Sequence, residues 1–280
     1  MILVTGATGN VGSQVVRELR ERGEAVRAFV RDRDRAAEKL GSDIELAIGD
    51  LADAASVRAA VEGADAVLVS SADGPQKVEH EKNVIDASVA AGAHPVVKVS
   101  TISAEAGSPL PPFDWNGRSE DVLWQAGVPA VVLQSSFYMT NLLASAEQIR
   151  QTGKLFAPAG EARIAMIDPR DVAAVAAVAL TEDGHEGQTY VLSGPEAITY
   201  ADVAAALGVE FVDVPDDALR QGLTEAGMPD WLVSHLTQLF PLLREGLAEQ
   251  TTDTVERLTG RHPRSFREFA RDYAPAFAAP

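Results

Sequence analysis

The chain has 280 residues, of which 46% are hydrophobic, and its formal net charge is −17 at pH 7. This composition is typical of a globular protein with a sizeable core. The acidic charge and the lack of a Lys/Arg stripe predict no nucleic-acid partner. With no cysteine, disulfides, zinc–thiolate sites and a cysteine nucleophile are excluded. No apolar run of about 18 residues is present, so we expect no membrane span.

The first predicted strand begins at Met1 and leaves no room for a signal or transit peptide, so we expect a cytoplasmic protein. Five histidines show no i,i+4 pair and no carboxylate cluster at ligand spacing, which predicts no metal site. His80 lies between Glu79 and Glu81 in a helical stretch, and these acidic neighbours favour a solvated helix face.

Residues 1–12 place a strand, a glycine-rich turn and a helix start in succession. Gly6 allows a sharp turn, Gly9 removes a Cβ where backbone would approach a phosphate, and Gly12 lets the helix lie close to the strand. Free N–H groups and the helix dipole would then face an anion. The pattern predicts a dinucleotide pyrophosphate site made by Gly6, Thr8, Gly9, Asn10, Val11 and Gly12.

Strand and helix patterns alternate through the first half of the chain. Further strands are predicted at residues 25–30, 44–48, 66–69, 96–99 and 130–133. Helices are predicted at residues 11–22, 36–40, 54–61, 78–91 and 119–126, several of them ending at a glycine. This alternation predicts an α/β fold with a doubly wound parallel sheet (a Rossmann fold) that binds its ligand at the carboxyl ends of the strands.

The alternation loosens after about residue 135. Residues 139–151 look helical, 154–165 are rich in Gly and Pro without periodicity, and 168–180 form a helix that Asp168 caps. Short strands are predicted at 189–192 and 210–214, and the rest is mostly helical. We therefore expect a dinucleotide-binding domain of residues 1–135 plus about 166–195. A smaller, mostly helical C-terminal substrate lobe comprises about 136–165 and 196–280.

Arg31 follows the second predicted strand, at the place that distinguishes NADP from NAD. A guanidinium there suits a 2′-phosphate, which predicts NADP. Asp32 would instead hold a 2′-hydroxyl, so NAD stays open. After the third strand, Asp50 and Leu51 are predicted to contact the adenine, although Asp50 would also serve as a cap for the helix starting near Asp53.

Together with these residues, the motif at 167–173 (Ile-Asp-Pro-Arg-Asp-Val-Ala) resembles the NmrA-like family, atypical relatives of the short-chain dehydrogenases/reductases. The stretch 259–266 resembles the closing motif of many bacterial members, so the resemblance spans the full length. It implies a Rossmann fold, a bound NAD(P), and similarity to reductases of quinones and of triphenylmethane dyes. The family also contains regulators that bind the dinucleotide without turning it over, so the resemblance leaves activity open.

The chain departs from active short-chain dehydrogenases at two positions. Their Tyr and Lys, four residues apart, correspond here to Asn116 and Glu120. An Asn is no general acid, and a Glu does not lower a neighbour's pKa, so Tyr–Lys chemistry is not expected. The resemblance still places Trp115 and Asn116 beside the nicotinamide, as a wall and a hydrogen-bonding group.

Lys98 is a charged residue inside the apolar run 96–99. It would stabilise an enolate-like oxygen as a catalytic residue, or its side chain would reach solvent at the strand end. Ser100 and Thr101 lie where the dehydrogenases keep a substrate-binding hydroxyl, and either residue would serve. Ser100 is also predicted to contact the cofactor. Ser70 and Ser71, after the fourth strand, are predicted to pass beneath it.

Residues after the sixth strand are predicted to line the substrate site. Phe137 and Tyr138 suit stacking on a planar aromatic molecule, Tyr138 also has a phenolic proton for catalysis, and Asn141 follows them. The alternative is that both aromatic residues belong to an ordinary core.

We therefore expect an NADPH-dependent reductase that transfers hydride to a small planar conjugated substrate, such as a quinone or a biosynthetic aromatic intermediate. One alternative is an NAD(P)-sensing regulatory protein without turnover. Another is an NADP-bound enzyme of redox-neutral chemistry. The chain is expected to be a monomer or a homodimer, since the apolar stretch 228–247 suits either a core or a dimer face.

Overall fold

The computed structural model describes residues 1–278, which divide into two compact units. The first comprises Met1–Ser135, Pro169–Val191 and Arg257–Gly260. The second comprises Ser136–Asp168, Leu192–Glu256 and the chain from Arg261 onward. Arg257–Gly260 was expected in the C-terminal lobe, but its Arg257 guanidinium lies 5.8 Å from the ring centroid of Tyr190 in the first unit. Within the described chain, no helix has the length and apolar character needed to cross a membrane.

The first unit is built on a seven-stranded sheet with the order β3-β2-β1-β4-β5-β6-β8. The strands are β1 (Ile2–Val4), β2 (Val26–Val30), β3 (Glu45–Ile48), β4 (Ala66–Val69), β5 (Val96–Thr101), β6 (Ala130–Ser135) and β8 (Gln188–Leu192). Every pairing from β3 through β6 is parallel. The chain reverses its direction of strand addition between β1 and β4, which is where doubly wound sheets bind ligands. The predicted fold class is confirmed.

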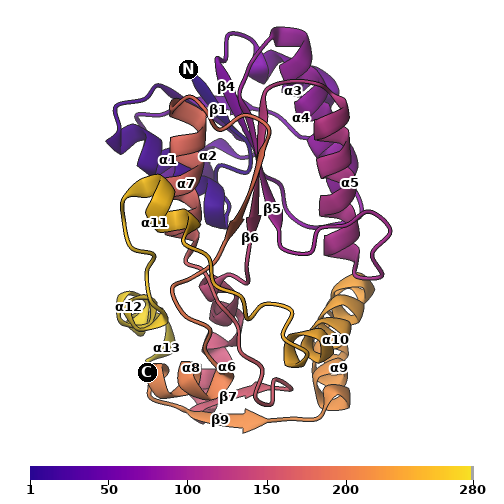
Figure 1. The fold of residues 1–280 in the computed structure, drawn as a ribbon, viewed down its shortest axis with the longest axis vertical. Helices are drawn as coiled ribbons and strands as arrows, with labels where there is room; N and C mark the ends of the chain where they lie inside the picture. The colour runs from indigo at the N-terminus through magenta and orange to yellow at the C-terminus, as the bar shows by residue number, and fades with distance from the viewer. Residues whose placement is uncertain (279–280) are drawn as a thin grey trace. The chain divides into compact units, whose positions relative to one another are not determined.

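Helices cover both faces of this sheet (Figure 1). One face carries α1 (Asn10–Glu21), α2 (Arg33–Leu40) and α7 (Pro169–Thr181), and the other carries α3 (Ala54–Val61), α4 (Lys77–Ala91) and α5 (Pro111–Gln125). Because both faces are covered, central strands are apolar along their length: Val67, Leu68 and Val97 are fully buried. The alanines of α7 are buried as well and allow close packing against α1.

Helix α5 is longer than expected, since it begins at Pro111 and not near residue 119. Pro111 and Pro112 occupy its first turn, where a missing N–H costs no hydrogen bond and the fixed φ suits a helix. This extension makes Trp115 and Asn116 helical residues whose side chains are buried.

The second unit is mostly helical. It contains a 3₁₀ segment, η1 (Met139–Ser145), and the helices α6 (Ala146–Thr152), α8 (Tyr200–Leu207), α9 (Asp216–Glu225), α10 (Asp230–Arg244), α12 (Phe266–Asp272) and α13 (Ala274–Phe277), while α11 (Thr254–Thr259) spans the boundary. Residues 154–165 were expected to be irregular, but β7 (Lys154–Ala157) pairs in parallel with β9 (Glu210–Asp213). The pairing partner lies over fifty residues along the chain, beyond the reach of a local pattern.

The glycine-rich turn between β1 and α1 is closed by its own backbone. Gly6 has φ +60°, and a Cβ on it would lie 2.6 Å from the carbonyl oxygen of Ser70. A Cβ on Gly12 would lie 2.2 Å from the carbonyl oxygen of Gly6. Gly6 is therefore required because the turn lies close to the end of β4, and Gly12 because α1 lies close to the turn. Neither requirement depends on a ligand.

We predict that Gly12→Ala lowers the free energy of unfolding by about 1–3 kcal/mol, because its methyl group meets immobile backbone. Helix propensity alone predicts the opposite, a gain of about 1 kcal/mol. Gly74→Ala is the control, since nothing lies within 4 Å of its Cβ position. Urea unfolding of both variants measures the difference, and equal stabilities would contradict this account of the turn.

Candidate functional site

The carboxyl end of β1 leads into a helix N-terminus without a side-chain cap. Thr5 Oγ1 donates to the carbonyl oxygen of Ser70 at 3.0 Å and accepts from its N–H at 2.9 Å, which joins the ends of β1 and β4. Gly9 is the N-cap of α1 and makes no side-chain capping hydrogen bond. In contrast, Asp32 caps α2 and Asp53 caps α3. A helix start of this kind suits an anion, so the turn fits a pyrophosphate.

Arg31 is exposed directly after β2. The neighbouring Asp32 carboxylate accepts from the backbone N–H groups of Asp34 at 2.9 Å and Arg35 at 3.1 Å. One oxygen of Asp32 is thus used by the α2 cap, while the Arg31 guanidinium extends from the surface. Lys39 adds a second cation at this edge, because its ammonium donates to the carbonyl oxygen of Thr8 at 2.7 Å.

Asp50 lies in the turn after β3 and does not cap α3. Its Oδ1 accepts from the N–H of Ala52 at 2.9 Å, whereas Asp53 accepts from Ala55 at the N-terminus of α3. The carbonyl oxygen of Leu51 accepts from Asn83 Nδ2 at 2.8 Å, which ties this turn to α4. The capping alternative for Asp50 is therefore wrong, and its contact with an adenine stays a prediction.

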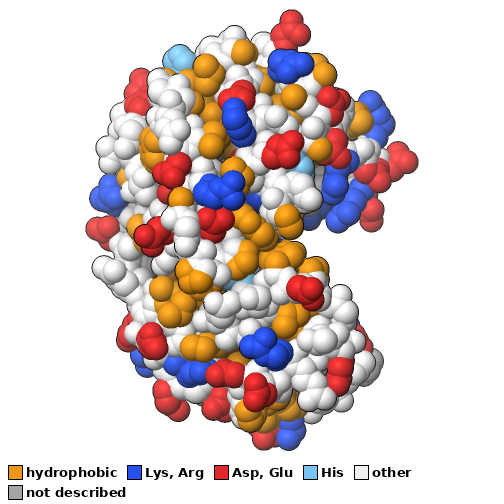
Figure 2. Space-filling model, turned by 90° about the vertical axis from the view of Figure 1, so that its right-hand side faces the viewer, with side chains coloured by type: hydrophobic (Ala, Val, Ile, Leu, Met, Phe, Trp, Pro, Cys, Tyr) orange, Lys and Arg blue, Asp and Glu red, His pale blue; other side chains and the backbone are white. Residues whose placement is uncertain are grey.

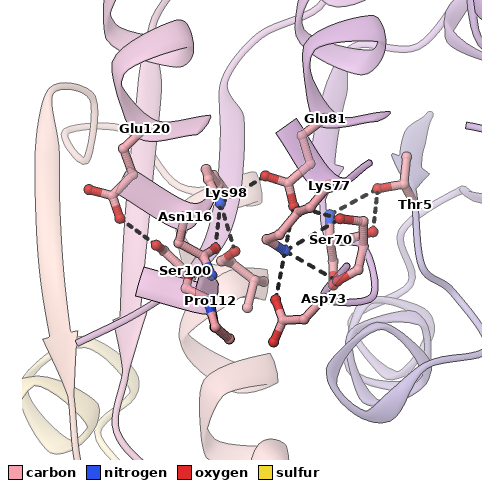
Figure 3. A network of polar contacts seen from close by, with 12 residues as sticks. Thr5, Ser70, Asp73, Lys77, Glu81, Lys98, Ser100, Pro112, Asn116 and Glu120 are labelled. Carbon is pink, nitrogen blue, oxygen red and sulfur yellow. Dashed lines mark hydrogen bonds and ion pairs between the residues drawn. The ribbon is translucent and has the colours of Figure 1, made fainter. Parts of the chain in front are cut away.

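A buried network of charges joins α4 to β5 (Figure 3). Glu81 is fully buried, with Lys77 Nζ 2.8 Å from its Oε1 and Lys98 Nζ 2.9 Å from its Oε2. Ser71 Oγ also donates to Oε1, at 2.8 Å. At its outer end, Lys77 lies 3.5 Å from the exposed Asp73. One carboxylate thus holds two buried ammonium groups and the hydroxyl of a predicted cofactor-binding serine.

Lys98 is fully buried, so the expectation that its side chain reaches solvent is wrong. Besides Glu81 Oε2, the Lys98 ammonium donates to Asn116 Oδ1 at 3.0 Å and to the carbonyl oxygen of Val99 at 3.2 Å. Three oxygen atoms therefore surround a group that has three N–H bonds. A lysine can occupy this apolar strand because its ammonium pairs with a carboxylate and donates two hydrogen bonds.

The network sets the charge of its members. Burial acts to raise the pKa of Glu81, but the ammonium groups of Lys77 and Lys98 outweigh it and hold the pKa at about 2. Burial lowers the pKa of Lys98, against the attraction of Glu81. Burial also acts to lower the pKa of Lys77, but the carboxylates of Glu81 and Asp73 outweigh it and raise the pKa.

Lys77 and Glu81 were overlooked in the sequence, where residues around His80 were interpreted as a solvated helix face. Glu79 is exposed and His80 is half-buried, but Lys77 and Glu81 are buried. The available signal was helical spacing: both charged residues fall on the face of α4 that continues through the buried Val84, Ile85 and Ser88.

Asn116 and Lys98, both predicted to act at the site, are in direct contact. Asn116 is buried on α5, and its Nδ2 donates to the carbonyl oxygen of Pro112 at 2.9 Å while its Oδ1 accepts from Lys98. The neighbouring Trp115 is buried in the same helix. The two bonds orient the Asn116 amide.

A second polar cluster joins β5, α5 and β6. The Ser100 hydroxyl donates to Glu120 Oε1, and Gln134 Nε2 lies 3.0 Å from Glu120 Oε2 and 3.2 Å from Oε1. Burial raises the pKa of the Glu120 carboxyl, against the hydrogen bonds from Ser100 and Gln134. The sequence identifies Glu120 only as the residue at the position of the dehydrogenase lysine. It does not predict this cluster, because the partners of Glu120 lie on two strands.

The remaining predicted substrate residues belong to the second unit. Phe137 and Tyr138 are half-buried and Asn141 is exposed, so the two aromatic side chains are not fully enclosed in a core. The backbone of Tyr138 forms a parallel bridge with Ile167. Contact of these three residues with a substrate stays a prediction.

The surface charges agree with the acidic composition. On the face drawn in Figure 2, basic side chains are interrupted by Asp and Glu. Among residues 1–278, no group of three or more His, Asp or Glu side chains is arranged to hold a metal ion. That the protein binds neither a nucleic acid nor a metal stays a prediction.

Comparison with known proteins gives a match to the model of the NmrA-like family over residues 1–270. An NAD(P)H azoreductase of Xenophilus azovorans is 38% identical, with 100% of each chain covered. A (4-alkanoyl-5-oxo-2,5-dihydrofuran-3-yl)methyl phosphate reductase of Streptomyces griseus is 37% identical over 99% of each chain. The crystal structure of an NADPH-dependent quinone oxidoreductase of Escherichia coli, complexed with NADPH, superposes with a TM-score of 0.87 and 29% identity, covering 97% of this chain and 99% of that one.

We predict that Glu81→Gln lowers the free energy of unfolding at neutral pH by about 3–5 kcal/mol, because the buried Lys98 loses its direct counter-charge and Lys77 keeps only the exposed Asp73. The folded-state pKa of about 2 lies below the ordinary value near 4.3. The carboxylate therefore contributes stability above its ordinary pKa, and this contribution is lost as the pH falls towards 2.

The difference between wild type and Glu81→Gln should accordingly narrow below about pH 4.5 in denaturant unfolding at a series of pH values. Glu79→Gln is the matched control on the exposed side of α4, and it should change stability by less than about 0.5 kcal/mol. A gap between wild type and Glu81→Gln that is constant with pH would contradict the ion-pair account.

Proposed function

This chain belongs to the NmrA-like family, and from that membership we propose that it is an NADPH-dependent reductase of a small, planar, conjugated acceptor. The observation that carries the proposal is its similarity, along the whole of both chains, to a protein named NAD(P)H azoreductase. Two further relatives are named as reductases of a 5-oxo-dihydrofuran and of quinones. Azo groups, such furans and quinones are conjugated electrophiles, which supports a quinone-like or biosynthetic aromatic acceptor for this chain.

The first unit supports a bound dinucleotide at the carboxyl ends of its strands. The uncapped start of α1 suits the pyrophosphate, and Gly6, Thr8, Gly9, Asn10, Val11 and Gly12 make up that turn. Asp50 and Leu51 would bind the adenine, and Ser70, Ser71 and Ser100 would lie along the cofactor. When bound, NADPH supplies a hydride, and the protein supplies orientation and electrostatics.

The preference for NADPH rests on Arg31. Its guanidinium is exposed at the end of β2 and suits a phosphate through paired, charge-assisted hydrogen bonds. Asp32, the residue that would favour NAD, uses its Oδ1 to hold two backbone N–H groups of α2. NAD stays possible as a second cofactor.

Asn116 takes the place of the usual tyrosine and acts by orientation. Its Oδ1 is engaged by Lys98 and one Nδ2 hydrogen by Pro112, which leaves its second N–H, among the residues described, for a ligand oxygen. The Lys98 ammonium pairs with Glu81 and donates to Asn116 Oδ1, so we assign to it the orientation and polarisation of Asn116. An electrophilic acceptor needs no Tyr–Lys pair, because orientation supplies much of the rate.

For the acceptor, Trp115, Phe137, Tyr138 and Asn141 are the proposed lining residues. Phe137 and Tyr138 would stack on a flat molecule, and Tyr138 offers a phenolic hydroxyl. A cytoplasmic location and a monomeric or homodimeric state complete the proposal.

NADPH oxidation, followed by absorbance with a panel of quinones, azo compounds and cationic dyes, tests the function. We expect turnover with at least one acceptor. Tight NADPH binding without any turnover would overturn the reductase and favour an NAD(P)-sensing regulator. Conversion of a substrate without net NADPH oxidation would favour redox-neutral chemistry on a bound cofactor.

We predict that Arg31→Ala raises the dissociation constant of NADPH by about 10- to 100-fold, as expected for loss of hydrogen bonds to a charged phosphate. The dissociation constant of NADH should be almost unchanged. Arg58→Ala, an exposed arginine on α3, is the control and should affect neither cofactor. Calorimetric titration with both cofactors checks this, and equal effects of Arg31→Ala on the two would contradict the 2′-phosphate contact.

A further inference from the structure

Reduction of most conjugated acceptors needs a proton as well as a hydride. A hydride brings two electrons to a quinone and leaves a negative oxygen, which must bind one proton to give the hydroquinone. Neither Asn116, which is no acid, nor Lys98, whose ammonium is surrounded by acceptors, is suited to release that proton.

Glu120 is a buried carboxylic acid at this end of the sheet, and its ordinary pKa is far below that of a phenol such as Tyr138. The residue is only 8% exposed, and the direct partners of its carboxyl, Ser100 and Gln134, are neutral. This surrounding is opposite to that of Glu81, which has ammonium groups on both oxygens. Burial without a direct counter-charge favours the protonated form of a carboxyl group.

The charged groups around the two carboxyls keep their protonation states apart. Lys98 on β5 attracts the ionised form of Glu120, but it lies in direct contact with Glu81 of α4, which Lys77 also holds. Asp121 on α5 repels the ionised form of Glu120. Burial raises the pKa of Glu120 while that of Glu81 is about 2. Such divergence is typical of sites where one carboxyl acts as an acid.

Ser100 connects this acid to the carboxyl end of β5. When Glu120 is ionised, the Ser100 hydroxyl donates to Oε1. When Glu120 is protonated, the same contact carries the carboxyl proton towards Ser100 Oγ, and the hydroxyl hydrogen is free to point at a ligand. Gln134 donates to the other oxygen, Oε2, in either state. Figure 3 shows Ser100 between Glu120 and the end of α5 where Pro112 lies.

We propose that Glu120, acting through the Ser100 hydroxyl, supplies the proton that completes reduction of the acceptor; this inference rests on the proposed reductase function. When bound, NADPH would supply the hydride from its own C–H bond, and the acceptor would be left with a negative oxygen or nitrogen. The Ser100 O–H bond breaks as its proton moves to the anionic oxygen or nitrogen, and the Glu120 proton moves to Ser100 Oγ. Glu120 is left as a carboxylate, which takes up a proton from water for the next cycle.

Two kinds of acceptor separate proton delivery from hydride transfer. A quinone needs one hydride and one proton, whereas a cationic triarylmethane dye needs only a hydride to become a neutral product. We expect Glu120→Gln to lower the ratio of kcat/KM for the quinone to kcat/KM for the dye by about 100-fold, the size of a lost general acid. Ser100→Ala should lower the ratio similarly, with little further loss in the double variant. Glu120→Asp should restore part of it.

Glu79→Gln, an exposed carboxyl on α4, is the matched control and should leave the ratio near the wild-type value. Because the ratio compares two acceptors on the same protein sample, partial misfolding cancels from it. If wild type reduces both acceptors and Glu120→Gln leaves the ratio unchanged, the role of Glu120 is overturned while the proposed reductase function stands. A wild type inactive on every acceptor overturns the proposed function, and this proposal with it.

The cofactor-free protein provides an independent readout. In protein labelled with ¹³C at the glutamate carboxyls, the signal that disappears in Glu120→Gln belongs to Glu120. We expect this signal to titrate above the ordinary midpoint of about 4.3. A midpoint at or below that value overturns the proposal whatever the turnover shows.

Discussion

The carboxylate of Glu81 is the interaction on which the polar interior of the first unit depends. It lies between two buried ammonium groups, and through them it joins α4 to β5 and, by way of Lys98 and Asn116, to α5. Ser71 brings the end of β4 into the same network. Removing Glu81 would leave the buried Lys98 ammonium without a direct counter-charge, so this carboxylate holds the four elements in one arrangement.

The two carboxyls on α4 and α5 show how one face of the sheet provides two chemical environments. Glu81, between cations, stays ionised down to about pH 2, whereas Glu120, bound by a serine and a glutamine, is biased towards its protonated form. The first is suited to holding a structure and the second to giving up a proton. Their difference comes from partners, since the side chains are chemically the same.

Much of the first unit could be predicted because its signals are local. The apolar runs of the parallel strands, the glycines that end helices and the residues of the first turn lie close together in sequence, and the structure has those elements within a few residues of their expected bounds. The start of α5 and the strand β7 were missed. Pro111 and Pro112 look like a break unless they fall in a first helical turn, and β7 depends on a partner far along the chain.

By itself the sequence determined the doubly wound fold, the dinucleotide turn and the basic residue that follows β2. Each depends on the conformation or charge of residues within a short span. Only the tertiary structure decided the partners and the protonation of Lys98 and Glu120. Lys98 on β5 is buried and held by Glu81 of helix α4, and Glu120 is paired with Ser100, twenty positions away. Protonation and orientation are properties of a surrounding, and folding assembles that surrounding from distant parts of the chain.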